Sequence, residues 1–130
     1  MHGTESAVAV RREAPAADNL QQLLSLCLDC ARACLRCADE CLAADDPQQL
    51  SRCLQLSLDC ADRCFALAPV PVAKDSATMG ELLTICAEAC ERAAVECRKQ
   101  GARHQHCRLC AEICERCGEA CRTAAPALAA

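Results

Sequence analysis

The sequence predicts an all-α fold, an antiparallel up-down four-helix bundle with a cysteine-lined core. Four segments rich in helix-forming residues are separated by proline, glycine and capping residues, and short connections between helices favour antiparallel neighbours. The chain has 130 residues, the size of one domain, and 16 of them are cysteines that recur at helical spacing. Aromatic residues make up only 1% of the chain, so something other than aromatic rings must fill the core.

The N-terminal part of the chain is expected to lie outside the bundle. Residues 1–17 contain many small residues without a clear period, so we expect an N-terminal arm that is flexible or forms a short helix. The cysteine-rich bundle then spans residues 18–130. Its first helix is predicted over residues 18–44, because Asp18 suits the N-cap and Gln21 completes a capping box.

The second helix is predicted to begin at Asp46-Pro47. Aspartate suits an N-cap, proline suits the first helical position, and Gln49 stands where the partner of a capping box belongs. The helix should run to about Leu67, because Pro69 and Pro71 remove backbone donors beyond it and force an extended connection.

The third and fourth helices complete the predicted bundle. The third should begin near Thr78, with Glu81 as its capping-box partner, and stop around Gln100-Gly101, because glycine readily takes the left-handed conformation that ends a helix. The fourth should fill residues 102–124, before Pro126 and the alanine-rich tail end it.

The cysteines fall on one face of each predicted helix. Spacings of three and four residues alternate along the first and fourth helices, which is the pattern of a core-facing stripe. The second and third helices carry sparser cysteines in the same phase, so all 16 can face one interior. The stripe lacks cysteine near Leu56 or Ser57 and near Ala93 or Ala94, which leaves space for metal. The candidate metal ligands are Cys27, Cys30, Cys34, Cys37, Cys41, Cys53, Cys60, Cys64, Cys86, Cys90, Cys97, Cys107, Cys110, Cys114, Cys117 and Cys121.

The spacing of the cysteines along the helices predicts the chemistry of the core. Residues three or four apart on a helix have Cβ atoms about 5–6 Å apart, so a pair such as Cys30 and Cys34 can hold one ion between two sulfurs. Thiolates select Cu(I), Zn(II) or iron–sulfur clusters, and a ladder of two-sulfur sites suits Cu(I) best. Uncompensated thiolates in a dry core would be very costly, whereas one monovalent ion per thiolate leaves the core near neutral. We therefore predict that many Cu(I) ions bind along the core.

Other features narrow the function further. The sequence begins with methionine and shows no secretory signal, so we expect a cytoplasmic protein with reduced thiols. The net charge of −4 indicates no nucleic-acid partner, and no apolar run is long enough for a membrane span. The absence of a nucleophile–base set and of a glycine-rich phosphate loop predicts a binding protein rather than an enzyme.

The chain resembles the cytosolic copper storage proteins, a family of cysteine-rich four-helix bundles. The resemblance covers about residues 18–124 and rests on the repeated C-x-x-x-C and C-x-x-C spacings. It implies that all 16 cysteines are Cu(I) ligands, that the bundle assembles as a homotetramer, and that a histidine-bearing mouth admits metal. A copper chaperone is a candidate partner for delivery.

Two histidines are candidates for that mouth. His104 precedes Cys107 by three residues and His106 precedes Cys110 by four, so either could share a face with a thiolate. The spacing does not choose between them. We expect metal to be admitted at this polar end of the bundle and leucines such as Leu67 to close the other end.

Other thiol chemistries remain as alternatives. A zinc or general thiolate metal buffer would hold at most about four ions if each takes four thiolates. An iron–sulfur redox protein is less favoured, because cluster cysteines usually lie in loops. A disulfide-stapled bundle would need an oxidising compartment, and a thiol-redox enzyme would need a βαβ context that the sequence lacks.

Overall fold

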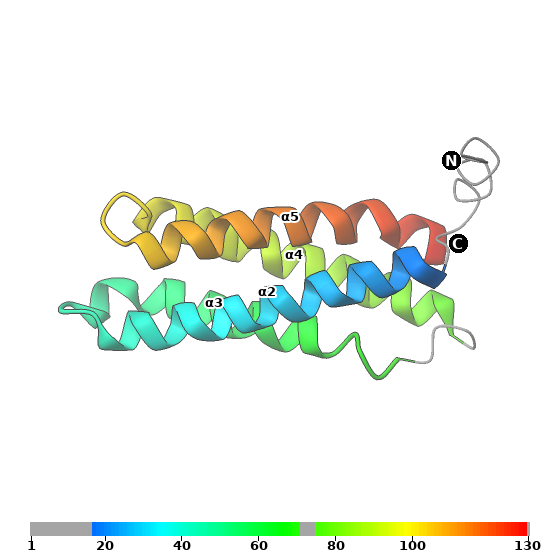
Figure 1. The fold of residues 1–130 in the computed structure, drawn as a ribbon, viewed down its shortest axis with the longest axis horizontal. Coiled ribbons are helices and arrows are strands. Elements are labelled where there is room, and N and C mark those ends of the chain that lie inside the picture. The colour runs from blue at the N-terminus through cyan, green and yellow to red at the C-terminus, as the bar shows by residue number, and fades with distance from the viewer. Residues whose placement is uncertain (1–16, 71–74, 130) are drawn as a thin grey trace.

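The computed structural model describes residues 17–70 and 75–129. These residues form four long helices, α2 (Ala17–Ala43), α3 (Ser51–Phe65), α4 (Ser76–Gln100) and α5 (Gln105–Ala129), with a short 3-10 helix η1 (Pro47–Leu50) before α3. The helices lie side by side in one elongated bundle (Figure 1). The all-α four-helix prediction is confirmed for this part of the chain. The predicted arm lies outside the described residues, apart from Ala17 at the start of α2.

The helices run up and down in chain order. Figure 1 shows each helix returning along the one before it. Side-chain contacts give the same directions: Cys27 near the start of α2 touches Cys121 near the end of α5, whereas Cys41 near the end of α2 touches His106 near the start of α5. In the ring around the core, α2 packs against α3 and α5, and α4 also packs against α3 and α5. All four helices therefore contribute one face to a shared interior.

The second helix differs from its prediction at both ends. Pro47 does lie at the first helical position, but the Asp46 side chain makes no capping bond, and the first four residues form a 3-10 turn. In this turn Gln49 donates its backbone N–H to the Asp46 carbonyl at 3.3 Å, so the predicted capping box is wrong. The helix ends at Phe65 rather than at about Leu67.

The chain turns after Phe65 instead of extending. Backbone N–H groups in this turn donate hydrogen bonds to the carbonyl three residues earlier, and Leu67 donates to the Cys64 carbonyl at 3.3 Å. Leu67 in this turn is fully buried. Its burial favours the turn, which ends at Pro69, and the extended connection predicted around Pro71 lies outside the described residues.

The cap of α4 is Asp75, not Thr78. Asp75 accepts a hydrogen bond from the Thr78 backbone N–H at 3.1 Å, so the helix begins at Ser76. The predicted end at Gly101 is confirmed, but its φ of −65° is right-handed and the left-handed prediction is wrong. A Cβ atom at Gly101 would lie 3.2 Å from the Arg108 Cβ, so this glycine permits a close approach between the loop and α5.

The last helix begins later and ends later than predicted. Residues 101–103 form a turn, and the His104 carbonyl accepts from the Cys107 and Arg108 N–H groups to start α5 at Gln105. The helix continues through Pro126 to Ala129. Proline removes a single helical hydrogen bond, to the carbonyl of Arg122, and that residue is exposed on the surface near the helix end. The loss there is small enough for the helix to continue.

Cysteines and small residues build the core. All 16 cysteines are buried, none more than 2% exposed, and alanines on the same helices are buried beside them. Leu67, Met79 and Leu83 are fully buried and lie near the end of α3 or the start of α4. None of the helices in residues 17–70 and 75–129 combines the length and apolar character that crossing a membrane requires.

Candidate metal centre

The cysteine sulfurs gather in groups along the bundle axis. All 16 cysteines are free thiols. Within each group the ligand atoms lie within 4.8 Å of one another, which is close enough for one ion to reach all of them. The five groups are Cys27, Cys86, Cys117 and Cys121; Cys30, Cys64, Cys90 and Cys117; Cys30, Cys34, Cys60 and Cys114; Cys37, Cys41, His106 and Cys107; and Cys37, Cys53 and Cys97.

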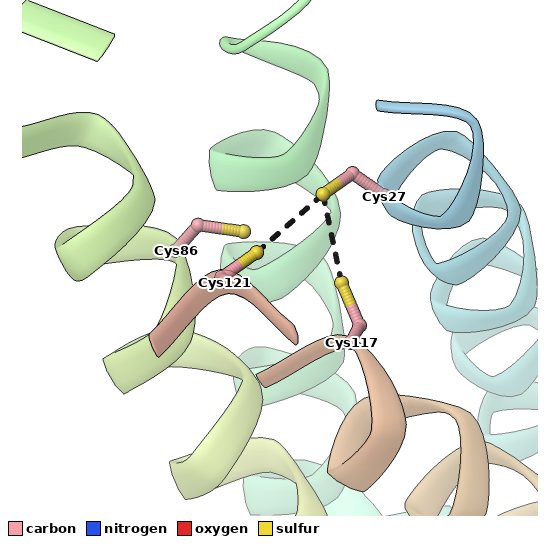
Figure 2. A group of neighbouring side chains, drawn as sticks. All are labelled: Cys27, Cys86, Cys117 and Cys121. Carbon is pink, nitrogen blue, oxygen red and sulfur yellow. Dashed lines mark hydrogen bonds between the residues drawn. The ribbon is translucent and has the colours of Figure 1, made fainter. Parts of the chain in front are cut away.

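The group nearest the leucine-closed end draws its thiols from three helices. Figure 2 shows the sulfurs of Cys27, Cys86, Cys117 and Cys121 turned toward one another from α2, α4 and α5. The Cys27 sulfur lies 3.5 Å from that of Cys121 and 3.7 Å from that of Cys117. Cys64 adds a fourth helix, because its sulfur lies 3.5 Å from that of Cys86.

The middle of the bundle continues this array without a break. Cys117 belongs to the first and second groups, and Cys30 belongs to the second and third, so neighbouring groups share a thiol. The Cys60 sulfur lies 3.5 Å from that of Cys90, and the Cys34 sulfur lies 3.6 Å from that of Cys114. A soft ion bound in one group therefore has a thiol in common with the next.

The other end of the bundle combines thiols with an imidazole. The His106 Nε2 atom lies 3.4 Å from the sulfurs of both Cys41 and Cys107. Cys37 joins this group to the three-thiol group, in which the sulfurs of Cys53 and Cys97 are 3.0 Å apart. This end can thus offer three thiolates and one neutral nitrogen to a single ion.

The two candidate histidines occupy different positions. His106 reaches the thiols, whereas the ring of His104 lies 5.5 Å from the His106 ring, centre to centre, and no hydrogen bond within residues 17–70 and 75–129 joins it to a sulfur. Both line a surface hollow of about 570 Å³ whose wall also includes the acidic residues Glu40, Asp45 and Asp46. The structure therefore brings His106, and not His104, to the thiol array.

Burial and thiol–thiol hydrogen bonds perturb the cysteines. Burial, with a smaller repulsion from Cys37, raises the pKa of Cys41 to about 11. Hydrogen bonding with Cys114 and Cys34 lowers the pKa of Cys110 to about 5, and hydrogen bonding with Cys110 raises the pKa of Cys34. In each contact the donor keeps its proton more firmly, so a metal ion that binds the array must displace protons.

The stripe positions without cysteine are occupied by small buried side chains. Ser57 of α3 and Ala93 of α4 are both fully buried. The Ser57 hydroxyl lies 3.8 Å from the Cys97 sulfur and 4.0 Å from the Cys110 sulfur. The spacing of the cysteines predicts only space at these positions, and the structure shows that the serine places an oxygen among the thiols.

A helical bundle whose interior is lined along its length by reduced thiols, with an imidazole at one end, defines a protein that binds several soft metal ions. The donors are sulfur and nitrogen only, which excludes a site built for magnesium or calcium from the array. The sequence profile of the copper storage protein family matches residues 16–126. The chain belongs to the copper storage protein family.

Individual relatives agree with this assignment. A cytosolic copper storage protein from Streptomyces lividans, in a structure with five coppers, is 36% identical with a TM-score of 0.74, over 80% of this chain and 89% of that one. The Cu(I)-bound copper storage protein BsCsp3 is 36% identical with a TM-score of 0.72, over 81% and 96%. The uncharacterized cysteine-rich protein YhjQ of Bacillus subtilis is 40% identical over 84 residues, which are 65% of this chain and 75% of that protein.

Proposed function

We propose that this protein stores many Cu(I) ions in the cytoplasm on the thiolates of its 16 cysteines. The observation that carries the proposal is the array itself, in which every cysteine is buried and free and most neighbouring groups share a thiol. Each Cu(I) ion that replaces a thiol proton leaves the net charge of the core unchanged. The array can therefore fill without accumulating charge in a dry interior, and the role is binding without catalysis.

The geometry favours copper over a zinc buffer. Zinc takes four ligands in a closed tetrahedron. Three of the groups with four donors can be occupied at the same time because they have no residue in common, namely those that contain Cys27, Cys34 and His106. Residues 17–70 and 75–129 thus offer at most three such zinc sites. A zinc ion among four thiolates also leaves two uncompensated negative charges in the core, a cost that monovalent copper avoids. The Streptomyces lividans protein has been seen with 10 copper equivalents.

Copper is proposed to enter and leave at the His106 end. The hollow beside His106 carries the carboxylates of Glu40, Asp45 and Asp46 against the cation of Arg103. The excess of negative charge among these residues attracts a cation or a cationic surface on a chaperone that delivers copper. His106 and Cys41 are then the first ligands that an incoming ion meets. At the opposite end, Leu67 and Leu83 are fully buried and close the array.

A homotetramer is proposed as the assembled form. Leu35, Leu42 and Leu58 are 40%, 61% and 42% exposed in the single chain, on the outer faces of α2 and α3. Leucines that are not needed in a thiol-filled interior are free to pack between copies of the chain. Light scattering at several protein concentrations tests the proposal, and a monomer at all of them would refute it.

The first experiment is an anaerobic titration of the fully reduced protein with Cu(I) against a competing chelator, repeated with Zn(II). We expect copper to bind well beyond three ions per chain, toward about one per thiolate, while zinc saturates at about three or fewer. As a control, a variant with Ser in place of Cys27, Cys86, Cys117 and Cys121 should lose copper capacity and keep its helical circular dichroism. Saturation of the unaltered protein at about three ions of either metal would refute copper storage.

A further inference from the structure

The thiol array consists of two parts. The inner group comprises ten cysteines linked through the shared thiols of Cys30 and Cys117, and the outer group comprises five cysteines and His106 linked through Cys37. No hydrogen bond among the described residues joins a sulfur of one part directly to a sulfur of the other. The inner group is Cys27, Cys30, Cys34, Cys60, Cys64, Cys86, Cys90, Cys114, Cys117 and Cys121, and the outer group is Cys37, Cys41, Cys53, Cys97, Cys107 and His106.

The division falls where two helices lack a cysteine. In α3 the stripe passes from the outer Cys53 to the inner Cys60 through Ser57, and in α4 it passes from the inner Cys90 to the outer Cys97 through Ala93. Both intervening side chains are fully buried, so they face the interior. A hydroxyl is a poor ligand for a soft ion and a methyl group is none. At this level of the bundle, α3 and α4 therefore offer copper no thiol ligand.

One cysteine lies between the two parts. Cys110 belongs to neither group, and its sulfur lies 3.9 Å from the inner sulfurs of Cys34 and Cys114. Toward the outer group it lies 4.0 Å from the Ser57 hydroxyl, which is itself 3.8 Å from the Cys97 sulfur. Cys110 also follows the outer Cys107 by three residues on α5, a spacing that places two side chains on the same helix face.

We propose that Cys110 is the relay thiol through which Cu(I) passes between the outer and inner groups. The inference rests on the proposed storage function and adds a route to it. The step is a ligand exchange without change of oxidation state: the Cys110 thiolate forms a copper–sulfur bond, a copper–sulfur bond to an outer thiolate breaks, and the released outer thiolate takes over the negative charge that Cys110 gives up. A second exchange of the same kind passes the ion from Cys110 to Cys34 or Cys114.

The relay is tested by following copper uptake with time in Cys110→Ala and in a matched control, Cys121→Ala. Each variant removes one buried thiol from α5, but Cys121 lies in the inner group at the closed end. The probe is Cu(I) supplied anaerobically from a weak chelator, and the readout is copper bound per chain by native mass spectrometry. We expect Cys110→Ala to fill its outer group normally and its inner group slower by about tenfold or more, whereas Cys121→Ala should hold fewer ions in its inner group but fill the remaining inner sites without that delay.

A rescue variant separates a relay from a structural role. Ser57→Cys in the Cys110→Ala background places a new thiol beside Cys97, on the wall that lacks one, and should restore fast filling of the inner group. Cys110→Ser, which keeps the size of the side chain, should be as slow as Cys110→Ala. Uptake by Cys110→Ala at the rate of Cys121→Ala, or no gain from Ser57→Cys, would overturn the relay. Failure of the unaltered protein to bind copper beyond about three ions would instead refute the storage function.

Discussion

Lowering the pH should weaken copper binding, because protons and Cu(I) compete for the same sulfurs. At the His106 end, burial raises the pKa of Cys41 to about 11, and the hydrogen bond with Cys37 together with burial raises the pKa of Cys107. A group with a raised pKa stays protonated up to that higher pH. Both thiols therefore carry protons in the apo protein throughout the neutral range, and an ion that binds between them must release both.

The size of this pH effect on copper affinity follows from the number of protons released. Each proton released on binding changes the apparent association constant tenfold per pH unit, so a copper ion held by Cys41 and Cys107 should bind about 100-fold more weakly for each unit by which the pH falls. As the array fills toward one ion per thiolate, the dependence should decrease toward about tenfold per unit, because each further ion displaces about one proton.

The assay is an anaerobic competition titration at about pH 6, 7 and 8, with a chelator whose own proton dependence has been calibrated at each pH. Proton release measured in weak buffer with an indicator dye gives an independent count. Affinity that does not change across this range, or release of far less than one proton per copper, would show that the apo thiols are already ionised and would refute the argument from a neutral core.

Four further predictions concern single groups. The raised pKa of Cys41 stabilises the apo bundle below the ordinary thiol pKa of 9.0, so apo stability should fall as the pH rises from 9.0 to about 11, measured by urea unfolding. His106→Ala should weaken the first copper to bind by at least about tenfold, while His104→Ala should change it by less than about twofold, by chelator competition; equal effects would contradict the placement of His106. Asp75→Ala should cost about 1 kcal/mol of unfolding free energy through loss of the α4 cap. Leu67→Ala should cost about 2–5 kcal/mol and let a chelator withdraw copper faster, since it opens the closed end.

The sequence predicted correctly which side chains face the core, because helical periodicity fixes the direction in which each side chain points from its helix. Spacings of three and four residues place side chains on one face whatever the neighbouring helices do, and all 16 cysteines are buried as the spacing required. The grouping of the thiols could not be predicted in this way. It depends on the axial offset and rotation of one helix against the next, which no spacing within a helix records. The position of Cys110 between the inner and outer groups is therefore visible only in the structure.

Helix ends were harder to predict than helix faces. Asp75 and Thr78 are both good caps three residues apart, and the aspartate prevails because its carboxylate reaches the Thr78 N–H. The choice between the histidines has the same origin. Because α5 begins at Gln105, His104 lies before the helix, whereas His106 lies within the first turn, from which its Nε2 reaches the Cys107 sulfur. One local boundary thus decides which imidazole reaches the metal array.

A core of thiols leaves the empty bundle with little apolar area, and this explains where its other stabilising contacts lie. A buried cysteine buries less surface than leucine at the same position. On the outside, Arg98 pairs with Glu115 and Arg122 with Glu91 through two bonds each, which join α4 to α5. Exposed pairs of this kind contribute only about 0.2–1 kcal/mol each, so they cannot replace a leucine core. Bound copper adds to this stability, because each ion that binds only the folded chain adds its binding free energy to folding. Copper in this bundle is therefore both the stored cargo and a source of stability.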